Sequence, residues 1–233
     1  MAYHTGRPSS LQMFMRKKDG SDILVRNILM PFKDQDGKVT QLISFFFPLA
    51  DKDYDSTMLR SLYEAATRDP LTCLPGRKYM EACLQEELEK FRRTGNPFAV
   101  LFADADYLHE INNAYGHGAG DAMLKEIGLM LRKYGRKADR FCRWGGDEFV
   151  GLLQLRQPQD MEGAAQRLKK AAERCEIEVR GQTVSCQTAI GITVVRDDDT
   201  VESLVDRADR YMYGAKKISG NQIVTDFNAE QKG

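Results

Sequence analysis

Two carboxylates stand close together in the middle of the chain, Asp104 and Asp106, directly after the apolar segment 98–103. Side chains alternate along a strand, so both acids leave the end of this segment on the same side. Two like charges in such a place repel each other unless a cation lies between them. The pair is therefore a candidate metal site, and a helix cap or an ordinary loop acid is the alternative for an isolated Asp-x-Asp.

A second cluster reads Arg143-Trp144-Gly145-Gly146-Asp147-Glu148-Phe149. Its two glycines remove side chains at the tip of a predicted hairpin, where a ligand can then approach the backbone. A polar hairpin without a function is the alternative. It leaves unexplained why two acids open the apolar strand 149–153.

A third cluster covers residues 111–121, Ile-Asn-Asn-Ala-Tyr-Gly-His-Gly-Ala-Gly-Asp. The pattern predicts a short helix, a glycine-rich turn and a new helix that Asp121 caps. The glycines do not form a P-loop, because no Gly-Lys-Ser/Thr follows them. Taken alone, the cluster is a helix break, in which we expect His117 to be structural.

Alternating helical and strand patterns between residues 69 and 228 must position these clusters. They predict helices at 76–94, 121–134 and 160–175, a helix opened by Asp199 and Glu202 as a capping pair, strands at 98–103 and 222–227, and hairpins at 140–155 and around 180–182. This order predicts an α+β fold, an antiparallel sheet with helices on one side and extra elements appended.

The first fifty residues predict an antiparallel meander, with strands at 11–17, 22–31 and 38–47 joined by Asp19-Gly20 and Asp36-Gly37. A stripe of apolar residues predicts a linker helix at 51–68. The segment 16–39 resembles the C-terminal half of a PAS sensor domain. A sensory remnant and a generic meander that helps two chains to dimerise both remain open, and we infer no sensor ligand.

The composition is that of an ordinary globular protein, with 34 basic and 34 acidic residues. Proteins held on nucleic acid or anionic lipid by bulk charge usually carry a basic excess, so neither partner is expected. The longest apolar stretch, 42–50, is too short to span a membrane, and no signal sequence opens the chain, so we expect a cytoplasmic protein. Its 5 cysteines include no Cys-x-x-Cys pair and are interpreted as reduced structural thiols.

Together, the three clusters resemble the GGDEF family of diguanylate cyclases. Residues 143–149 contain the motif that names the family, Asp104 stands at the spacing of its metal-binding Asp, and Asn112 and Asp121 stand where it reads guanine. Residues 69–77 resemble the opening motif of the family, and 208–216, with Ala208-Asp209 and Tyr213-Gly214-Ala215-Lys216, resemble its closing helix. The resemblance covers residues 69–228, leaves 229–233 as a tail, and implies a ferredoxin-like sheet of the palm-type nucleotidyl cyclases.

The resemblance implies that two GTP molecules are joined head to tail at a homodimer interface, giving cyclic di-GMP and two pyrophosphates. It implies two Mg²⁺ ions, with Mn²⁺ as an alternative. Their ligands would be Asp104, the Ala105 carbonyl, Asp147 and Glu148. Asp147 or Glu148 would also help to take the proton of the attacking 3′-hydroxyl.

The resemblance also implies contacts to GTP. The terminal phosphates would meet Lys216 and the backbone amides of Tyr107 and Leu108, with His109 beside them. The ribose and α-phosphate would lie on Gly145 and Gly146. Guanine would meet Asn112 and Asp121. Asp121 would favour GTP over ATP, because a carboxylate accepts from the N1–H and amine of guanine, which adenine does not present.

Two departures from the family and one regulatory motif complete the comparison. Leu108-His109 stands where the family has Phe-Lys, and Gly220 stands where it has a basic residue. The alternative function is therefore a catalytically weak GGDEF domain that binds GTP or cyclic di-GMP and signals to a partner. Arg136-Lys137-Ala138-Asp139 resembles the R-x-x-D site for product inhibition, to which Arg167 of a neighbouring domain would add a contact.

Overall fold

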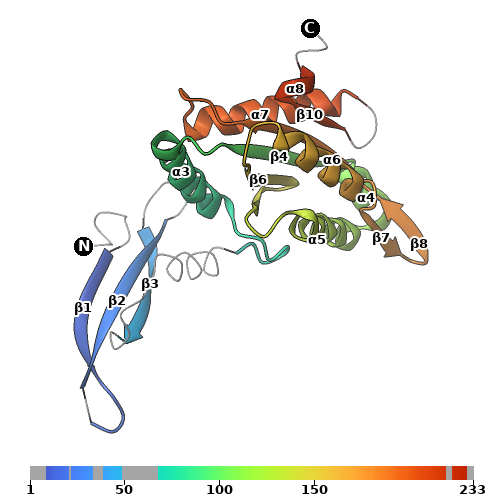
Figure 1. Cartoon of the computed structure of the whole chain (residues 1–233). Coiled ribbons are helices and arrows are strands. Elements are labelled where there is room, and N and C mark those ends of the chain that lie inside the picture. Colours follow the sequence, from blue (N-terminus) through green and yellow to red (C-terminus); the bar gives the residue numbers. More distant parts are fainter. Residues whose placement is uncertain (1–8, 21, 34–38, 49–67, 219–221, 230–233) are drawn as a thin grey trace. The chain divides into compact units, whose positions relative to one another are not determined.

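The computed structural model describes residues 9–20, 22–33, 39–48, 68–218 and 222–229 (Figure 1). The chain divides into two compact units, Met1–Arg60 and Ser61–Gly233. The linker helix predicted at 51–68 falls outside the described residues except for Arg68, and so does Gly220. None of the helices in the described ranges combines the length and apolar character that a membrane span requires.

The first unit contains a three-stranded antiparallel meander, as predicted. Strand β1 (Ser9–Arg16) pairs with β2 (Asp22–Lys33), which pairs with β3 (Val39–Pro48). Gly20 adopts φ +82° in the first turn, a conformation that favours glycine and explains the Asp-Gly signal there. The resemblance of this unit to a PAS domain stays a prediction.

The second unit is built on a five-stranded sheet with the order β10-β9-β4-β6-β5. Its strands are β4 (Phe98–Asp106), β5 (Arg140–Gly145), β6 (Glu148–Gln154), β9 (Gln187–Val194) and β10 (Ile223–Thr225). All neighbours are antiparallel except β10, which runs parallel to β9. The predicted α+β fold is confirmed, and the last strand makes the sheet mixed.

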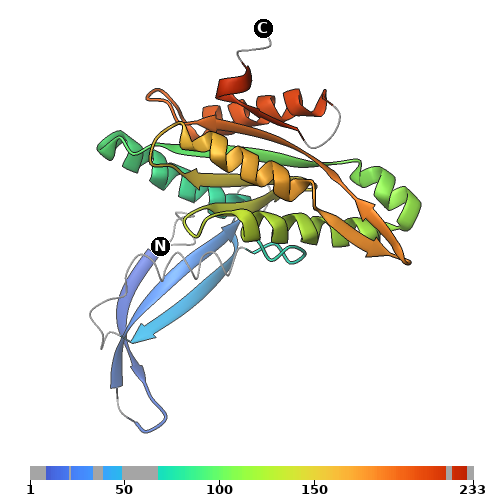
Figure 2. The same cartoon turned by 45° about the vertical axis from the view of Figure 1, so that its right-hand side comes forward.

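Helices cover both faces of this sheet, so the prediction of helices on one side was wrong (Figure 1, Figure 2). Phe98, Val100 and Phe102 of β4 pack with helices α3 (Arg77–Thr94) and α7 (Val201–Lys216). The alternate residues of β4 pack with α5 (His117–Tyr134) and α6 (Asp160–Ala172). The sequence of β4 gives the reason, because the strand is apolar without alternation and is therefore buried on both sides.

Two helix starts differ from the prediction. Helix α5 begins at His117, so Asp121 lies inside it rather than at its cap. The preceding helix α4 (Leu108–Tyr115) packs closely on α5. The contact is so close that a Cβ at Gly120 would collide with Asn112 Oδ1. Helix α7 is capped by Thr200, which forms a capping box with Ser203, and not by a pair of Asp199 and Glu202.

Asp199 instead forms a buried ion pair with Arg207 of α7. Its carboxylate accepts from both terminal nitrogens of Arg207, at 2.7 and 2.6 Å. Arg207 also donates from Nε to Thr193 Oγ1 at 2.6 Å. Arg207, which the acid before the helix holds, therefore ties α7 to β9.

The predicted second hairpin is present as a separate two-stranded sheet, β7 (Glu176–Val179) and β8 (Gln182–Ser185). Its turn contains Arg180 and Gly181, both with positive φ. All 5 cysteines are free thiols, and all except the exposed Cys73 are buried, in agreement with the structural interpretation.

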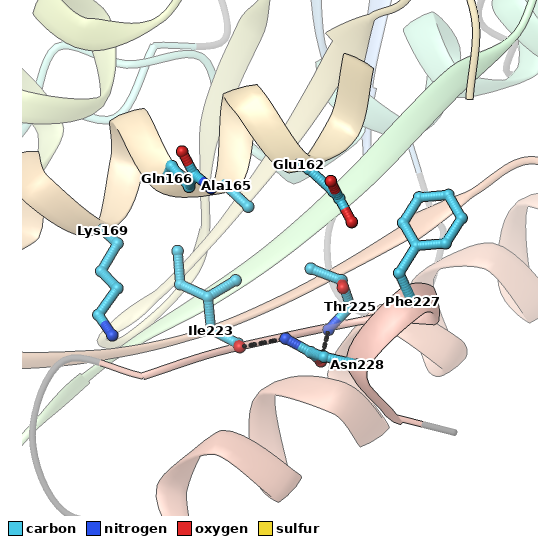
Figure 3. A pocket seen from close by; sticks show the side chains of 8 residues that line it. All are labelled: Glu162, Ala165, Gln166, Lys169, Ile223, Thr225, Phe227 and Asn228. Carbon is cyan, nitrogen blue, oxygen red and sulfur yellow. Dashed lines mark hydrogen bonds between the residues drawn. The ribbon is translucent and has the colours of Figure 1, made fainter. Parts of the chain in front are cut away.

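The last predicted strand ends early, at Thr225, and is followed by the short helix α8 (Asp226–Ala229). Asn228 closes the open edge of β10, because its amide accepts from Thr225 N–H at 2.7 Å and donates to the Ile223 carbonyl at 3.1 Å (Figure 3). A groove of about 340 Å³ lies there between α6 and the β10–α8 segment. None of the site residues predicted from the sequence lines it.

Candidate active site

The fold brings the predicted acidic residues together at the end of β4. Asp104 pairs with Glu148 of β6 across the ladder, and it is only 6% exposed. The Ala105 N–H donates to the Asp147 carbonyl at 3.2 Å, which joins the strand to the tip of the β5–β6 hairpin. Two segments far apart in sequence thus meet where the sequence predicts a metal site.

Neighbouring carboxylates help to raise the pKa of Asp104 and of Glu148. Burial raises the pKa of Asp104 most, the charges of Asp147 and Asp106 raise it further, and Lys216 opposes them. The pKa of Glu148 is raised by burial and then by the charges of Asp104, Asp147 and Asp209. The site therefore holds an excess of negative charge that a cation would relieve.

Lys216 is the cation that lies nearest to these acids. Its Nζ is 2.8 Å from Asp104 Oδ1 and 3.6 Å from Asp106 Oδ1. Burial lowers the pKa of Lys216, but the two carboxylates more than offset this and raise it above its ordinary value. Lys216 was predicted to contact a phosphate, whereas here it neutralises the acids that would hold the metal.

The donor set fits Mg²⁺, which prefers carboxylate and carbonyl oxygens. Asp104 Oδ1 is buried, and it is in ion-pair distance of Lys216 but makes no hydrogen bond to the described residues. Across the same residues, no three acidic, histidine or cysteine side chains are already grouped as a metal cluster. Asp104, Ala105, Asp147 and Glu148 thus provide atoms that suit a metal ion, and Lys216 lies beside one of them, Asp104.

The hairpin tip is locked by Arg143, to which the sequence analysis assigned no role. Its guanidinium donates to the Gly146 carbonyl at 2.9 and 2.6 Å, and Gly146 adopts φ +46°. One of its nitrogens also lies 3.1 and 3.2 Å from the carboxylate oxygens of Asp69. Asp69 in turn accepts from Thr72 N–H at 2.7 Å. The opening motif and the hairpin motif are therefore two halves of one clamp.

A second missed residue is Asp209 of α7, whose charge helps to raise the pKa of Glu148. Burial and then the charge of Asp206 raise the pKa of Asp209 itself. Both missed residues lie in motifs that the sequence shows, Arg143 in 143–149 and Asp209 in 208–216. Nothing local in the sequence says that Asp69 and Asp209 reach the hairpin.

The turn from β4 into α4 carries the residues predicted to meet phosphate. Tyr107 caps α4 with φ +63°, a left-handed conformation that costs a bulky residue energy and marks many functional sites. No side chain caps the first amides of α4. Leu108 follows half-buried, and His109 is exposed. The amides at this helix start are suited to bind an anion.

The residues predicted to read guanine lie on two packed helices. Asn112 of α4 places its side chain against Gly120 of α5, and Gly120 directly precedes Asp121. Asp121 is exposed on α5. The close packing at Gly120 therefore fixes the position of the Asn112 side chain beside the turn of α5 that carries Asp121.

The motif predicted to bind product folds as a tight turn. The Asp139 carboxylate, 2% exposed, accepts from Arg136 N–H at 2.7 Å and from Gln154 N–H at 3.1 Å. It also lies 3.7 Å from Arg167, whose Nε donates to the Tyr134 carbonyl at 2.7 Å. Asp139 thus holds the turn, while Arg136 is exposed. The three residues are together, and the carboxylate faces the protein.

Known proteins resemble this chain over the second unit. The family described as diguanylate cyclase, GGDEF domain, matches residues 66–222. Diguanylate cyclase DgcP of Pseudomonas aeruginosa is 34% identical over 160 residues, which are 69% of this chain and 24% of that protein. Diguanylate cyclase A of Treponema denticola is 30% identical over 171 residues, 72% of this chain and 46% of that protein. The chain thus spans less than half the length of either relative.

Solved structures give the same result. Diguanylate cyclase SiaD of Pseudomonas aeruginosa, in complex with its activator SiaC, matches with TM-score 0.68 and 32% identity, covering 72% of this chain and 66% of that chain. A GGDEF-only structure of TpbB, also called YfiN, from the same species matches with TM-score 0.64 and 34% identity, covering 71% of this chain and 99% of that chain. The second unit therefore has the fold of these domains.

Proposed function

Because this chain belongs to the GGDEF family of diguanylate cyclases, we propose that it condenses two GTP molecules into cyclic di-GMP and two pyrophosphates. The observation that carries the proposal is the charge cluster at the end of β4. There, buried Asp104 meets Glu148 and Asp147, and the cluster lies beside a glycine hairpin and an uncapped helix start. Acids that Lys216 compensates only in part, next to anion-binding amides, suit a metal-dependent transfer of a nucleotidyl group.

Each part of the cluster has a place in the reaction. The 3′-oxygen of each GTP forms a bond to the α-phosphorus of the other, each bond to pyrophosphate breaks, and Asp147 or Glu148 of each half-site accepts one hydroxyl proton. When bound by Asp104, Ala105, Asp147 and Glu148, Mg²⁺ or Mn²⁺ supplies positive charge against the phosphates. The amides of Tyr107 and Leu108 receive the terminal phosphates, with His109 nearby, and Gly145 and Gly146 leave room for the ribose.

Specificity and assembly follow from the same proposal. Asn112 and Asp121 bind the guanine edge from α4 and α5, with their spacing set at Gly120. One chain offers one such pair of residues, whereas the product is made from two nucleotides. The active form is therefore a homodimer with two facing half-sites. Arg136 and Arg167 bind the phosphates of cyclic di-GMP as an inhibitor, and Asp139 keeps their turn in shape.

One observation favours the second candidate function, a catalytically weak module that binds GTP or cyclic di-GMP and signals. Lys216 already neutralises Asp104 and Asp106, so the acids are partly compensated without a metal. A site of this kind binds a metal less strongly than one whose acids are free.

The deciding experiment incubates the purified chain with GTP and Mg²⁺ and measures cyclic di-GMP, with Asp147→Ala as the control. We expect product from the native chain only. If the native chain makes no more than the control but still binds cyclic di-GMP, the signalling module is the correct function. For guanine recognition, Asp121→Ser should relax the choice between GTP and ATP, and an unchanged preference would remove Asp121 from that role.

A further inference from the structure

A buried thiol lies directly behind the phosphate-facing turn. Cys186 stands between β8 and β9 and is 2% exposed. Its Sγ–H donates to the Asp106 carbonyl at 3.0 Å, and the Gln187 carbonyl lies farther away, at 3.3 Å. Burial raises the pKa of Cys186 to about 12, so the sulfur keeps the proton that it donates.

The accepting carbonyl belongs to the peptide unit that joins Asp106 to Tyr107. This unit is trans, so its C=O and its N–H point in opposite directions. The carbonyl lies against this buried sulfur, and Asp106 also pairs with Gln187 of β9, so the Tyr107 N–H points to the opposite side, away from Cys186. Tyr107 is also the residue with φ +63°, and such a conformation persists only where its surroundings fix it.

We propose that Cys186 is a positioning residue, which aims the Tyr107 amide at the terminal phosphates of GTP by holding the Asp106 carbonyl. The proposal rests on the proposed function, because that function places phosphate on Tyr107. Cys186 does not touch the substrate. It acts through the orientation of one peptide plane at the start of α4.

Three variants of the whole chain separate this role from simple packing. Cys186→Val fills the space but removes the donor, and Cys186→Ser keeps a donor. Cys175→Val is the matched control, since Cys175 is a second buried thiol at the base of the same hairpin, next to Cys186. If the valine variant does not fold, Cys186→Ala replaces it.

The measurements are the affinity for Mg²⁺·GTP and for guanosine, the KM and kcat of cyclic di-GMP formation, and hydrogen exchange of the amides at 107–111. Loss of one hydrogen bond should weaken GTP binding and raise its KM by about three- to tenfold. The affinity for guanosine, which has no phosphate, should not change. Amide exchange at Tyr107 should become faster in the valine variant only, and the serine variant should restore most of the GTP affinity.

Each outcome decides the proposal. An unchanged KM and unchanged exchange at Tyr107 in Cys186→Val would overturn it, even if the thermal stability falls. An equal loss of guanosine and GTP affinity would also overturn it, since that result indicates general damage to the site. If the native chain forms no cyclic di-GMP and binds no GTP, the proposed function fails, and the amide exchange alone decides the role of Cys186.

Discussion

Removing the clamp between Asp69 and Arg143 should loosen the hairpin tip that carries Asp147 and Glu148. The pair closes at 3.1 Å with side chains that are 17% and 18% exposed. Burial raises the pKa of Asp69, but hydrogen bonds from Thr72 and the charge of Arg143 more than offset it, so its pKa lies below the ordinary value. The carboxylate is therefore ionised and engaged at neutral pH.

The expected coupling lies between two limits. A hydrogen bond to a buried charged group contributes about 1.5–3 kcal/mol, and an exposed ion pair contributes about 0–1 kcal/mol. Since one nitrogen of Arg143 serves both oxygens of Asp69, we expect a coupling energy of about 1.5–2 kcal/mol. The exposed pair Arg77 and Glu81 is shorter, at 2.8 Å, but its side chains are 59% and 42% exposed. For that pair we expect about 0.3–0.5 kcal/mol.

The assay is a double-mutant cycle by urea unfolding, with Asp69→Ala, Arg143→Ala and both together, and the same cycle on Arg77 and Glu81 as the control. The cycle isolates the energy of this pair. The energies of the bonds from Arg143 to Gly146 and from Thr72 to Asp69 are lost in the single and the double variants alike, so they cancel. Asp69→Ala should also lower cyclic di-GMP formation by about tenfold or more, since misplaced reacting groups slow the reaction steeply. Equal couplings in the two cycles would refute the reasoning that burial, and not distance, decides the strength of the clamp.

Two further predictions concern the guanine helices and the acid stability of the second unit. Gly120→Ala should weaken GTP binding by about tenfold, because the new Cβ displaces Asn112. Gly118→Ala is the control and should not weaken binding, because its Cβ meets no atom within 4 Å. Equal GTP affinities of the two variants by calorimetry would contradict the role of the close packing. Asp199→Asn should lower the free energy of unfolding at pH 7 by about 3 kcal/mol, because it leaves the buried Arg207 without its counter-charge. Burial raises the pKa of Asp199, but hydrogen bonds from Arg207 and Ser203 lower it more, to below 3.8. The contribution of Asp199 to stability is thus complete above about pH 3.8 and is lost as the pH falls through the folded pKa. The difference in free energy of unfolding between the native chain and the variant should therefore shrink in acid. A constant difference in urea titrations from pH 7 to about pH 2.5 would contradict this assignment.

The sequence predicted those features that depend on local pattern. The strand 98–103, the Gly145-Gly146 tip and the Arg180-Gly181 turn are each determined by a few neighbouring residues, and all three are present. The start of α5 was predicted too late because the glycines before Asp121 were taken as a break. In the structure, Gly120 instead allows α5 to lie close against α4.

Features that depend on distant contacts could not be predicted. Lys216 is separated from Asp104 by most of the second unit, so only the folded sheet shows that they pair. The same holds for Asp69 with Arg143. Asp199 and Arg207 lie close in sequence, but there a residue that looks like a helix cap serves a buried ion pair. Asp139 is a different case. The sequence identified its motif, but it did not show that the carboxylate points into the protein.

The five-stranded sheet is closed at both margins by groups from its own chain. On β10, the amide of Asn228 takes the place of a neighbouring peptide, and beside β5, Arg143 bridges to Gly76 and donates its N–H to the Pro75 carbonyl. At an unpaired strand edge, a second molecule can add its own backbone as a further strand and remain attached. In the homodimer that we propose, the two molecules therefore have no such unpaired strand edge at these positions. Their contact would then rest on side-chain surfaces, which would let the partners separate after each turnover.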